Sequence, residues 1–357
     1  MTLPPPVWAD PARADAFAGW LQASAPAHRL LPDTLALASA DASFRRYFRI
    51  RTEDGASRII MDAPPAQEDC RPFVKVAELM AGGGLNAPRV LAWDQGLGFM
   101  LLSDLGSQTM LDVIDQQPEA EREKRADGLY RQAIETLVDW QLASRPDVLP
   151  PYDDALLSRE LALFPDWYVQ QHRGIDVDPP LRGKLDELFG QIKASNLQSL
   201  GGVRVFVHRD FMPRNLMVPD GGEPGLGVLD FQDAVYGPIT YDIASLMRDA
   251  FISWPENFVL EITVRYWEKA RKAGLPVGDD FGEFYRAVEW MGLQRHLKIL
   301  GIFARLTLRD GKPKYLADTP RFIAYARATC ARYRQLGPLM VLLDEIEGNE
   351  TRVGYTF

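Results

Sequence analysis

The sequence predicts an α+β protein with two lobes: a small N-terminal lobe with an antiparallel sheet and one helix, and a larger, mainly helical C-terminal lobe. Short segments with the alternation of strands fill much of residues 44–103, whereas long segments with helical spacing fill most of the chain beyond them. A length of 357 residues is enough for two lobes. We therefore expect lobes at 1–103 and 104–357.

The N-terminal lobe shows strand, turn and helix signals in a regular order. Two alternating segments flank the turn sequence TEDGA, and the amphipathic segment FVKVAELMAGGG ends at a run of glycines, which stop helices. The elements expected here are a helix at 10–24, strands at 44–51 and 57–65, a helix at 73–84 and two strands within 87–106.

The C-terminal lobe is dominated by long amphipathic segments. Helices are expected at 118–145, 154–173, 180–197, 257–273, 279–306 and 318–346. One strand pair interrupts them. Residues 216–218 and 226–229 are apolar and flank the glycine-rich turn PDGGEPG, so we expect them to pair antiparallel.

Composition and charge restrict the class of partner. The chain is 46% hydrophobic and carries a formal charge of −9, so it lacks the basic surface that nucleic acids require. It contains no apolar run of the ~18 residues that a membrane span needs, and its first residues lack the pattern of a signal peptide. Cys70 and Cys330 are far apart, which fits a reducing compartment. We expect a cytoplasmic monomer that binds neither nucleic acid nor membrane.

The segment VHRDFMPRNLMV, residues 207–218, places a carboxylate and an amide in a turn between apolar runs. Asn215 follows Asp210 by five residues, and the expected hairpin returns Asp230 to a place beside Asn215. Two carboxylates and an amide oxygen are costly to bring together unless a cation lies between them, and Mg²⁺ prefers such oxygen ligands. An Asp, an Asn five residues later and a second Asp opening a D-F-x segment form the phosphoryl-transfer pattern of protein-kinase-like folds.

On these residues the chain resembles a known family. HRDFMPRNLMV and LDFQDAVYGPITYDIASLMRD are similar to the catalytic loop, metal-binding Asp and following helix start of the aminoglycoside-phosphotransferase and choline-kinase branch of the kinase superfamily. The segments SFRRYFR, MDAPP, ELALFPDWY and LGIFARLTLRDGKPKYL also resemble the bacterial anomeric kinases of N-acetylmuramate and N-acetylglucosamine. The resemblance implies a protein-kinase-like two-lobed fold and an ATP- and Mg²⁺-dependent transferase that makes sugar 1-phosphates in peptidoglycan recycling.

The resemblance also implies roles for individual residues. Asp210 would accept the proton of the acceptor hydroxyl, and Asn215 and Asp230 would hold Mg²⁺ on the ATP phosphates. His208 is expected to brace the catalytic turn rather than to carry a proton. Asp242 would hydrogen-bond that turn or cap the helix it opens, and its role is structural in either case.

The nucleotide is expected to contact the N-terminal lobe. In the segment MLLSDLG, the backbone of Leu102, Ser103 and Asp104 would receive the adenine. Ser43 lies in the segment SADASFRRYFR, which lacks the glycine-rich pattern of kinases but can still offer backbone N–H groups to phosphates.

The N-terminal lobe departs from protein kinases in one cationic residue. Met61 stands where a kinase strand carries the Lys that grips the phosphates. We expect one of three arginines to replace it: Arg45, Arg46 or Arg49. In a strand, Arg45, Tyr47 and Arg49 share one face, and Arg46 lies on the other. The alternative is a surface strand whose arginines are solvated.

The acceptor sugar is expected near the segment SRELALFPDWYVQQH. Glu160, Phe164 and Trp167 fall at i, i+4 and i+7, on one face of a helix. Carboxylates bind sugar hydroxyls and aromatic rings cover the apolar face of a sugar, so these residues form a candidate pocket. The alternative is a helix that packs both aromatic rings into the core and leaves Glu160 exposed. Asp233 is a further substrate candidate, or a solvated turn residue.

Other functions stay open at this point. Within the same branch, the chain would act on an aminoglycoside, choline or homoserine. Because the strand Lys is missing, an inactive nucleotide-binding scaffold is a further alternative, although a scaffold has no need of Asp210, Asn215 and Asp230 together. A protein kinase is disfavoured, because the chain reaches YGPITYD within five residues of Asp233 and leaves no room for an activation loop.

Overall fold

The computed structural model describes residue 8 and residues 10–40, 44–220 and 225–349. The chain divides into two compact units. The first comprises Met1–Glu119 with Arg214–Asp233, and the second comprises Ala120–Pro213 with Ala234–Phe357. The lobes expected at 1–103 and 104–357 stay a prediction, and the first unit also includes a segment from the middle of the chain.

A five-stranded antiparallel sheet forms the first unit, with strand order β1-β2-β3-β5-β4. Its strands are β1 (Leu30–Ala40), β2 (Arg46–Thr52), β3 (Ser57–Asp62), β4 (Val90–Asp94) and β5 (Phe99–Ser103). The β2-β3 and β4-β5 pairs confirm the strands predicted within 44–65 and 87–106. The edge strand β1 is an addition to the predicted elements.

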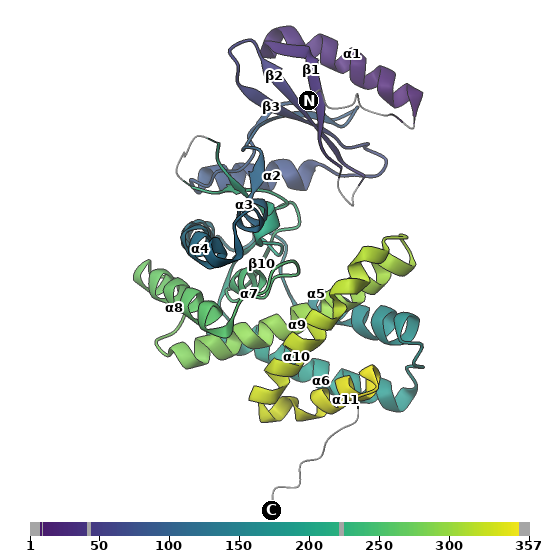
Figure 1. Cartoon of the computed structure of the whole chain (residues 1–357), viewed down its shortest axis with the longest axis vertical. Coiled ribbons are helices and arrows are strands. Elements are labelled where there is room, and N and C mark those ends of the chain that lie inside the picture. The colour runs from purple at the N-terminus through teal and green to yellow at the C-terminus, as the bar shows by residue number, and fades with distance from the viewer. Residues whose placement is uncertain (1–7, 9, 41–43, 221–224, 350–357) are drawn as a thin grey trace, which may run out of the picture. The chain divides into compact units, whose positions relative to one another are not determined.

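Helix α1 (Pro11–His28) packs along one face of this sheet (Figure 1). Asp10 caps the helix by accepting the N–H of Ala12, and Pro11 occupies a first-turn position that needs no N–H donor. The apolar side of α1 meets alternate residues of β2 and its neighbours, which form one buried cluster: Phe17, Trp20, Leu21, Ala25, Leu30, Phe48, Ile50, Ile60, Phe99 and Leu101. The sheet face that α1 covers is therefore the face of Phe48 and Ile50.

The remaining elements of the first unit are two helices and the strands of a second sheet, with order β6-β8-β9. These elements are α2 (Arg71–Gly82), α3 (Met110–Asp115), β6 (Gln108–Thr109), β8 (Leu216–Val218) and β9 (Gly227–Val228). Strands β8 and β9 pair antiparallel, which confirms the hairpin predicted from PDGGEPG. Val228 donates its N–H to the carbonyl of Asn86 at 2.8 Å, and the ring of Phe231 lies 4.9 Å from that of Phe73 in α2. These contacts fix the hairpin within the first unit.

The second unit is mainly helical. Its elements are α4 (Glu119–Leu142), α5 (Asp154–Leu163), the π-helix η1 (Phe164–His172), α6 (Pro179–Gln198), η2 (Ser199–Gly202), β7 (Arg204–Val207), β10 (Val235–Pro238), α7 (Tyr241–Met247), α8 (Glu256–Lys272), α9 (Phe281–Leu308), η4 (Pro313–Asp318), α10 (Thr319–Arg332), η5 (Arg334–Leu336) and α11 (Gly337–Glu347). The chain passes from the second unit to the first at η3 (Pro213–Asn215), a single helical turn. The long helices confirm the predicted pattern, except that the segment 154–173 divides into two helices and the segment 318–346 into three.

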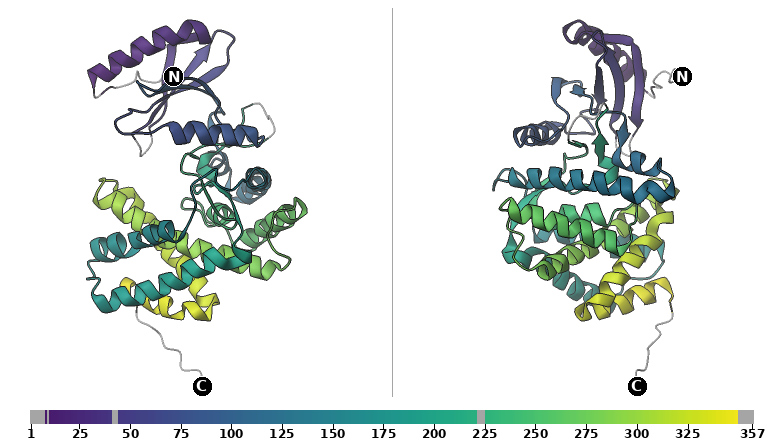
Figure 2. Two further views of the ribbon diagram at one scale, coloured as in Figure 1. Left: turned by 180° about the vertical axis from the view of Figure 1, so that it is seen from behind. Right: turned by 60° about the vertical axis from the view of Figure 1, so that its left-hand side comes forward.

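Helix α9 forms the centre of this unit (Figure 2). It contacts α5, α6, α7, α8 and α10, and most of its residues from Ala287 to Ala304 are buried. Close packing against the end of α5 requires a glycine, because a Cβ atom on Gly301 would lie 2.2 Å from the carbonyl oxygen of Leu163. This approach brings Glu160 of α5 to the polar side chains of α9.

Among the described residues, none of the helices has the length and apolar character needed to cross a membrane.

Candidate active site

The predicted catalytic residue lies in a tight turn that follows β7 in the second unit. Asp210 donates its backbone N–H to Nδ1 of His208 at 3.2 Å. The carboxylate of Asp242 accepts the backbone N–H groups of His208 at 2.7 Å and of Arg209 at 2.9 Å. His208 and Asp242 therefore both brace the turn that carries Asp210.

Asp242 is fully buried in the first turn of α7. Burial raises the pKa of its carboxyl group, although the charge of His208 and the two backbone hydrogen bonds oppose that rise. Thr240, the residue before α7, makes no side-chain cap. Two structural roles were expected for Asp242, and the structure shows the first of them, hydrogen bonding to the catalytic turn.

Two residues beside the functional groups adopt a left-handed backbone conformation. Arg209 has a φ angle of 78° and Asp230 has a φ angle of 62°. Such conformations cost about 1–3 kcal/mol in a residue other than glycine, and they concentrate at functional sites. Contacts from elsewhere hold Arg209 in place, since Arg295 donates Nη1 to its carbonyl oxygen at 2.7 Å.

The predicted metal ligands lie together in the first unit. Leu229 donates its N–H to the carbonyl of Asn215 at 2.9 Å, which aligns the two ends of the β8-β9 hairpin. Asn215 Nδ2 consequently reaches Oδ2 of Asp230 at 3.4 Å, and Gln232 Nε2 donates to Oδ1 of Asp230 at 2.9 Å. A carboxylate and an amide carbonyl are oxygen donors suited to Mg²⁺, which takes its other ligands from phosphates and water. The donor set therefore fits this ion.

The predicted site residues are divided between the units. Asn215 and Asp230 are brought together within the first unit, as the hairpin predicted, whereas Asp210 belongs to the second unit and precedes Asn215 by five residues in the chain. Asp233 is exposed in the turn that follows Asp230.

Glu160 is buried at the centre of a charged cluster in the second unit, with 4% of its surface exposed. Its Oε1 accepts hydrogen bonds from Arg209 Nη2 at 2.5 Å and Lys298 Nζ at 2.9 Å. Its Oε2 accepts from Tyr152 Oη at 2.5 Å and Gln294 Nε2 at 2.9 Å. Burial alone would raise the pKa of Glu160, but the charges of Lys298 and Arg209 hold it well below its ordinary value. Glu160 is thus an ionised carboxylate with both oxygens engaged by the protein.

Of the two aromatic residues predicted to share a face with Glu160, one lies in the helical core and the other packs against it. Helix α5 ends at Leu163 and the chain continues as the π-helix η1, whose wider turn alters the i, i+4, i+7 spacing. Phe164 is fully buried, its ring 5.6 Å from that of Tyr168, and it exposes no surface to a ligand. Trp167 packs against the same core and is partly buried. The alternative of an exposed Glu160 is wrong, because four neighbours cover its carboxylate.

All three arginines proposed to replace the missing Lys form ion pairs in the first unit. The nitrogen-to-oxygen distances are 3.0 Å for Arg45–Glu68, 2.5 Å for Arg46–Asp62 and 2.7 Å for Arg49–Asp104. The alternative of solvated surface arginines does not hold for Arg45, whose side chain is 9% exposed, whereas Arg46 and Arg49 leave 28% and 35% of their side chains exposed.

Arg46 differs from the other two arginines in the face it occupies. Its partner Asp62 is fully buried and also accepts Nε of Arg13, from α1, at 2.9 Å. The guanidinium of Arg46 lies 3.8 Å from the ring centre of Trp8. Arg46 therefore belongs to the contact between α1 and the sheet. Because side chains alternate along β2, Arg49 points to the opposite face.

The segment expected to receive adenine ends β5. Ser103 donates its N–H to the carbonyl of Arg89 at 3.0 Å and accepts the N–H of Arg89 on Oγ at 2.8 Å. Leu102 is buried beside it. Burial would raise the pKa of Asp104, but hydrogen bonds from Arg49 and Ser57 hold it below its usual value. Ser43 lies outside the described residues.

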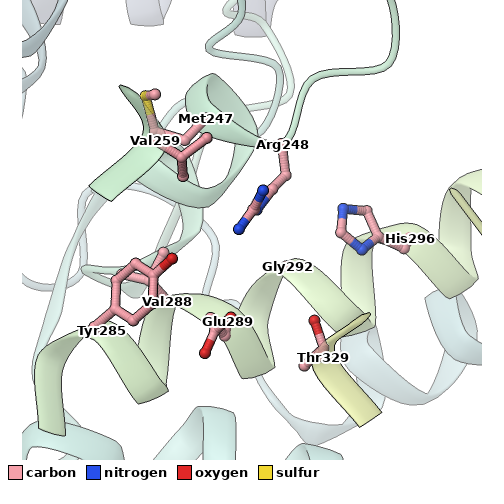
Figure 3. Close-up of a pocket in the computed structure, with 9 residues that line it drawn as sticks. All are labelled: Met247, Arg248, Val259, Tyr285, Val288, Glu289, Gly292, His296 and Thr329. Carbon is pink, nitrogen blue, oxygen red and sulfur yellow. The ribbon is translucent and has the colours of Figure 1, made fainter. Parts of the chain in front are cut away.

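The helical unit also contains a small cavity over α9 (Figure 3). Its polar lining includes Arg248, Glu289, His296 and Thr329. Figure 3 shows Arg248 extending above the segment of α9 that carries Glu289 and His296. Burial lowers the pKa of His296 well below its usual value, and the charge of Arg248 adds to this effect. The imidazole is consequently neutral at physiological pH.

Local spacing did not single out Gln294 or Lys298, which belong to the charged cluster around Glu160. Gln294, Arg295 and Lys298 lie on α9, and Lys298 Nζ also donates to Oη of Tyr241 at 3.2 Å. Two cationic side chains within an apolar, buried helix were the available signal, because such charges are buried only when they are paired.

The chain is similar in sequence to several known proteins. Residues 34–278 match the model of the phosphotransferase enzyme family. The chain is 48% identical over 341 residues to a protein of Pseudomonas aeruginosa named N-acetylmuramate/N-acetylglucosamine kinase, with 95% of both chains covered. Proteins of the same name from Neisseria meningitidis and Caulobacter vibrioides are 48% and 31% identical, over 95% and 87% of this chain and 97% and 92% of theirs.

Solved structures show the same fold at low sequence identity. Choline kinase LicA from Streptococcus pneumoniae matches with a TM-score of 0.60 and 11% identity, covering 88% of this chain and 99% of its own. A putative aminoglycoside phosphotransferase from Ralstonia eutropha matches with a TM-score of 0.59 and 16% identity, covering 92% and 98%. The amicoumacin kinase hAmiN, solved with AMP-PNP and Ca²⁺, matches with a TM-score of 0.58 and 17% identity, covering 87% and 93%.

Proposed function

Because the chain belongs to the phosphotransferase enzyme family, we propose that it transfers the γ-phosphoryl group of ATP to the anomeric hydroxyl of N-acetylmuramate and N-acetylglucosamine. The observation that carries this proposal is the 48% identity, over 95% of both chains, with a protein named for that activity on these two sugars. The products would be sugar 1-phosphates, which suits a role in peptidoglycan recycling.

Asp210 is the proposed base. It accepts the proton of the anomeric hydroxyl while the sugar oxygen forms a bond to the γ-phosphorus, and the bond from that phosphorus to the β–γ bridging oxygen breaks to release ADP. The anomeric hydroxyl is more acidic than the other hydroxyls, because the ring oxygen withdraws charge from its carbon. A weak base such as a carboxylate can therefore take its proton more easily. The bracing of the turn by His208 and Asp242 supports this role.

Asn215 and Asp230 are the proposed ligands of Mg²⁺. When bound, this ion neutralises charge on the phosphates of ATP. The hairpin contact between the two side chains, and the left-handed backbone of Asp230, support a site held in place before the nucleotide arrives. Since phosphoryl transfer has a loose transition state, positioning and charge neutralisation carry most of the catalysis.

For the sugar, Trp167 and Asp233 stay candidates, since both retain exposed surface. Phe164 exposes no surface, because it lies in the helical core, and it is no longer a candidate. Backbone groups of Leu102, Ser103 and Asp104 stay the proposed adenine contacts, apart from the N–H of Ser103, which donates to the carbonyl of Arg89.

Arg45 and Arg49 are the proposed cationic contacts to the ATP phosphates. Replacing either arginine with Gln removes a positive charge that the phosphates would otherwise meet. If one of them binds ATP, its variant is expected to raise the KM for ATP by about tenfold or more, since a hydrogen bond to a charged group contributes about 1.5–3 kcal/mol. The KM for the sugar should change much less. Steady-state kinetics with each substrate varied in turn gives both constants.

Arg46→Gln is the matched control for these two variants. It removes the same charge from the same strand, but its partner Asp62 lies at the contact with α1. We expect a lower melting temperature and an unchanged KM for ATP. An ATP KM unaltered in both Arg45→Gln and Arg49→Gln would rule out this contact.

The proposed function is tested with purified protein, ATP, Mg²⁺ and a panel of acceptors. The panel contains N-acetylmuramate, N-acetylglucosamine, an aminoglycoside, choline and homoserine. Mass spectrometry should detect a phosphorylated product from the two amino sugars. A product from choline, homoserine or the aminoglycoside alone would replace the proposed substrate class.

A further inference from the structure

The Glu160 cluster has no part in the chemistry proposed above. It consists of Glu160 with the four side chains that donate hydrogen bonds to its carboxylate: Tyr152, Arg209, Gln294 and Lys298. Three segments far apart in sequence supply these residues, which are the chain around α5, the catalytic turn and α9. A buried cluster with three charged members is costly to assemble and is weak evidence for stability alone. A role connected with the turn explains it better.

The cluster contacts the catalytic turn at the residue before Asp210. Arg209 is the member with a left-handed backbone, at a φ angle of 78°. Its guanidinium is held by Glu160, its N–H by Asp242 and its carbonyl by Arg295. These three contacts come from three different helices, so they determine the orientation of the Arg209 peptide units. The unit that carries the Arg209 carbonyl joins Arg209 to Asp210, which has to face the acceptor hydroxyl.

The other members of the cluster act on Glu160 itself. Lys298 and Gln294 lie one turn apart on α9 and donate to different oxygens of the carboxylate, while Tyr152 approaches from the chain before α5. The carboxylate therefore has a fixed orientation. Protein groups donate hydrogen bonds to both of its oxygens. A sugar hydroxyl would therefore have to displace one of these donors in order to bind Glu160.

We propose that Glu160 is a positioning residue that holds the catalytic turn through its ion pair with Arg209 and so aims Asp210 at the acceptor. This inference rests on the proposed function, because it assigns Asp210 as the base. It also replaces the substrate-binding role that the sequence suggested for Glu160.

Glu160→Gln tests this inference, since the amide keeps the size of the side chain and loses its charge. The expected result is a fall in kcat of about a hundredfold, as for a misplaced catalytic group. The KM values for ATP and sugar should stay within about threefold of wild type, because a positioning role gives Glu160 no contact with either substrate. Asp154→Asn makes the same chemical change on α5, at an exposed residue paired with Lys193, and should leave kcat unchanged.

A double variant separates positioning from stability. Glu160→Gln alone raises the net charge of the cluster from +1 to +2, and this is expected to lower the melting temperature. Combining it with Lys298→Met restores the net charge of the wild-type cluster without restoring the ion pair to Arg209. The double variant should therefore regain melting temperature but not kcat. It also provides the decisive measurement if the single variant does not fold.

Two results would overturn the positioning role. One is recovery of kcat in the double variant, which would mean that charge balance alone matters. The other is an unchanged kcat with a raised sugar KM in Glu160→Gln, which would return Glu160 to the sugar site. Failure of the proposed function is recognised separately, because wild-type protein would then make no sugar phosphate at all.

Discussion

Replacement of Asp210 with Asn is expected to lower kcat by about 10²–10⁴-fold, the contribution of a positioned general base. The amide resembles the carboxylate in shape but cannot take the proton of the acceptor hydroxyl. The backbone N–H of residue 210 still donates to His208, so the turn should keep its conformation. Affinity for the nucleotide should remain, because the base is needed only for the acceptor.

Initial rates and calorimetry with ADP and Mg²⁺ measure the two quantities separately. Asp139→Asn makes the same substitution at an exposed position of α4 and serves as the control. Turnover of Asp210→Asn within about threefold of wild type would mean that another group accepts the proton.

Asp230→Asn is expected to weaken binding of the magnesium nucleotide as well as turnover. The substitution removes the only charge that this pair of ligands offers to the ion, and the loss of a metal contact lowers affinity by at least about tenfold. Asn adopts left-handed backbone conformations more readily than most residues, so the φ angle of 62° at this position should survive. The defect is therefore expected in the site and not in the hairpin.

The measurement for Asp230→Asn is ADP affinity with and without Mg²⁺. In the wild type, Mg²⁺ should strengthen ADP binding, and in the variant most of that difference should disappear. Equal strengthening by Mg²⁺ in both proteins would mean that Asp230 is not a ligand. Asp220→Asn, at the start of the glycine-rich turn that follows β8, is a control within the same hairpin.

Local sequence signals were sufficient for the hairpin of the candidate metal site. Glycines between two short apolar segments require the chain to reverse, and the antiparallel pairing of β8 with β9 follows from that reversal. The meeting of Asn215 with Asp230 follows from the register of the two strands, in which Leu216 pairs with Val228. For this reason a contact across fifteen residues was predictable without knowledge of the rest of the fold.

Local signals were not sufficient for Glu160 or for β1. Glu160 receives hydrogen bonds from residues 134 and 138 positions later, and helical spacing describes only neighbours within a few turns. The onset of a π-helix at Phe164 then removed the regular spacing on which the predicted sugar-binding face depended. In β1, Pro32 and two register shifts interrupt the alternation by which a strand is recognised.

The role of Arg46 was likewise not predictable from local sequence signals. Alternation along β2 correctly separated Arg46 from Arg49, but it did not indicate which face α1 would cover. The contact between α1 and this face includes Arg13 of α1, which donates a hydrogen bond to the carboxylate of Asp62, as Arg46 does. This tertiary contact of Arg46 leaves Arg45 and Arg49 as the proposed contacts to the nucleotide.

The position of the phosphoryl group on the product tests the proposed reaction most directly. Phosphorus NMR of the product from either amino sugar should show coupling to the proton on C1, as in a sugar 1-phosphate. The 1-O-methyl glycoside of N-acetylglucosamine lacks the acceptor hydroxyl and should not react. Coupling to the protons on C6, or turnover of the methyl glycoside, would contradict phosphorylation at the anomeric hydroxyl.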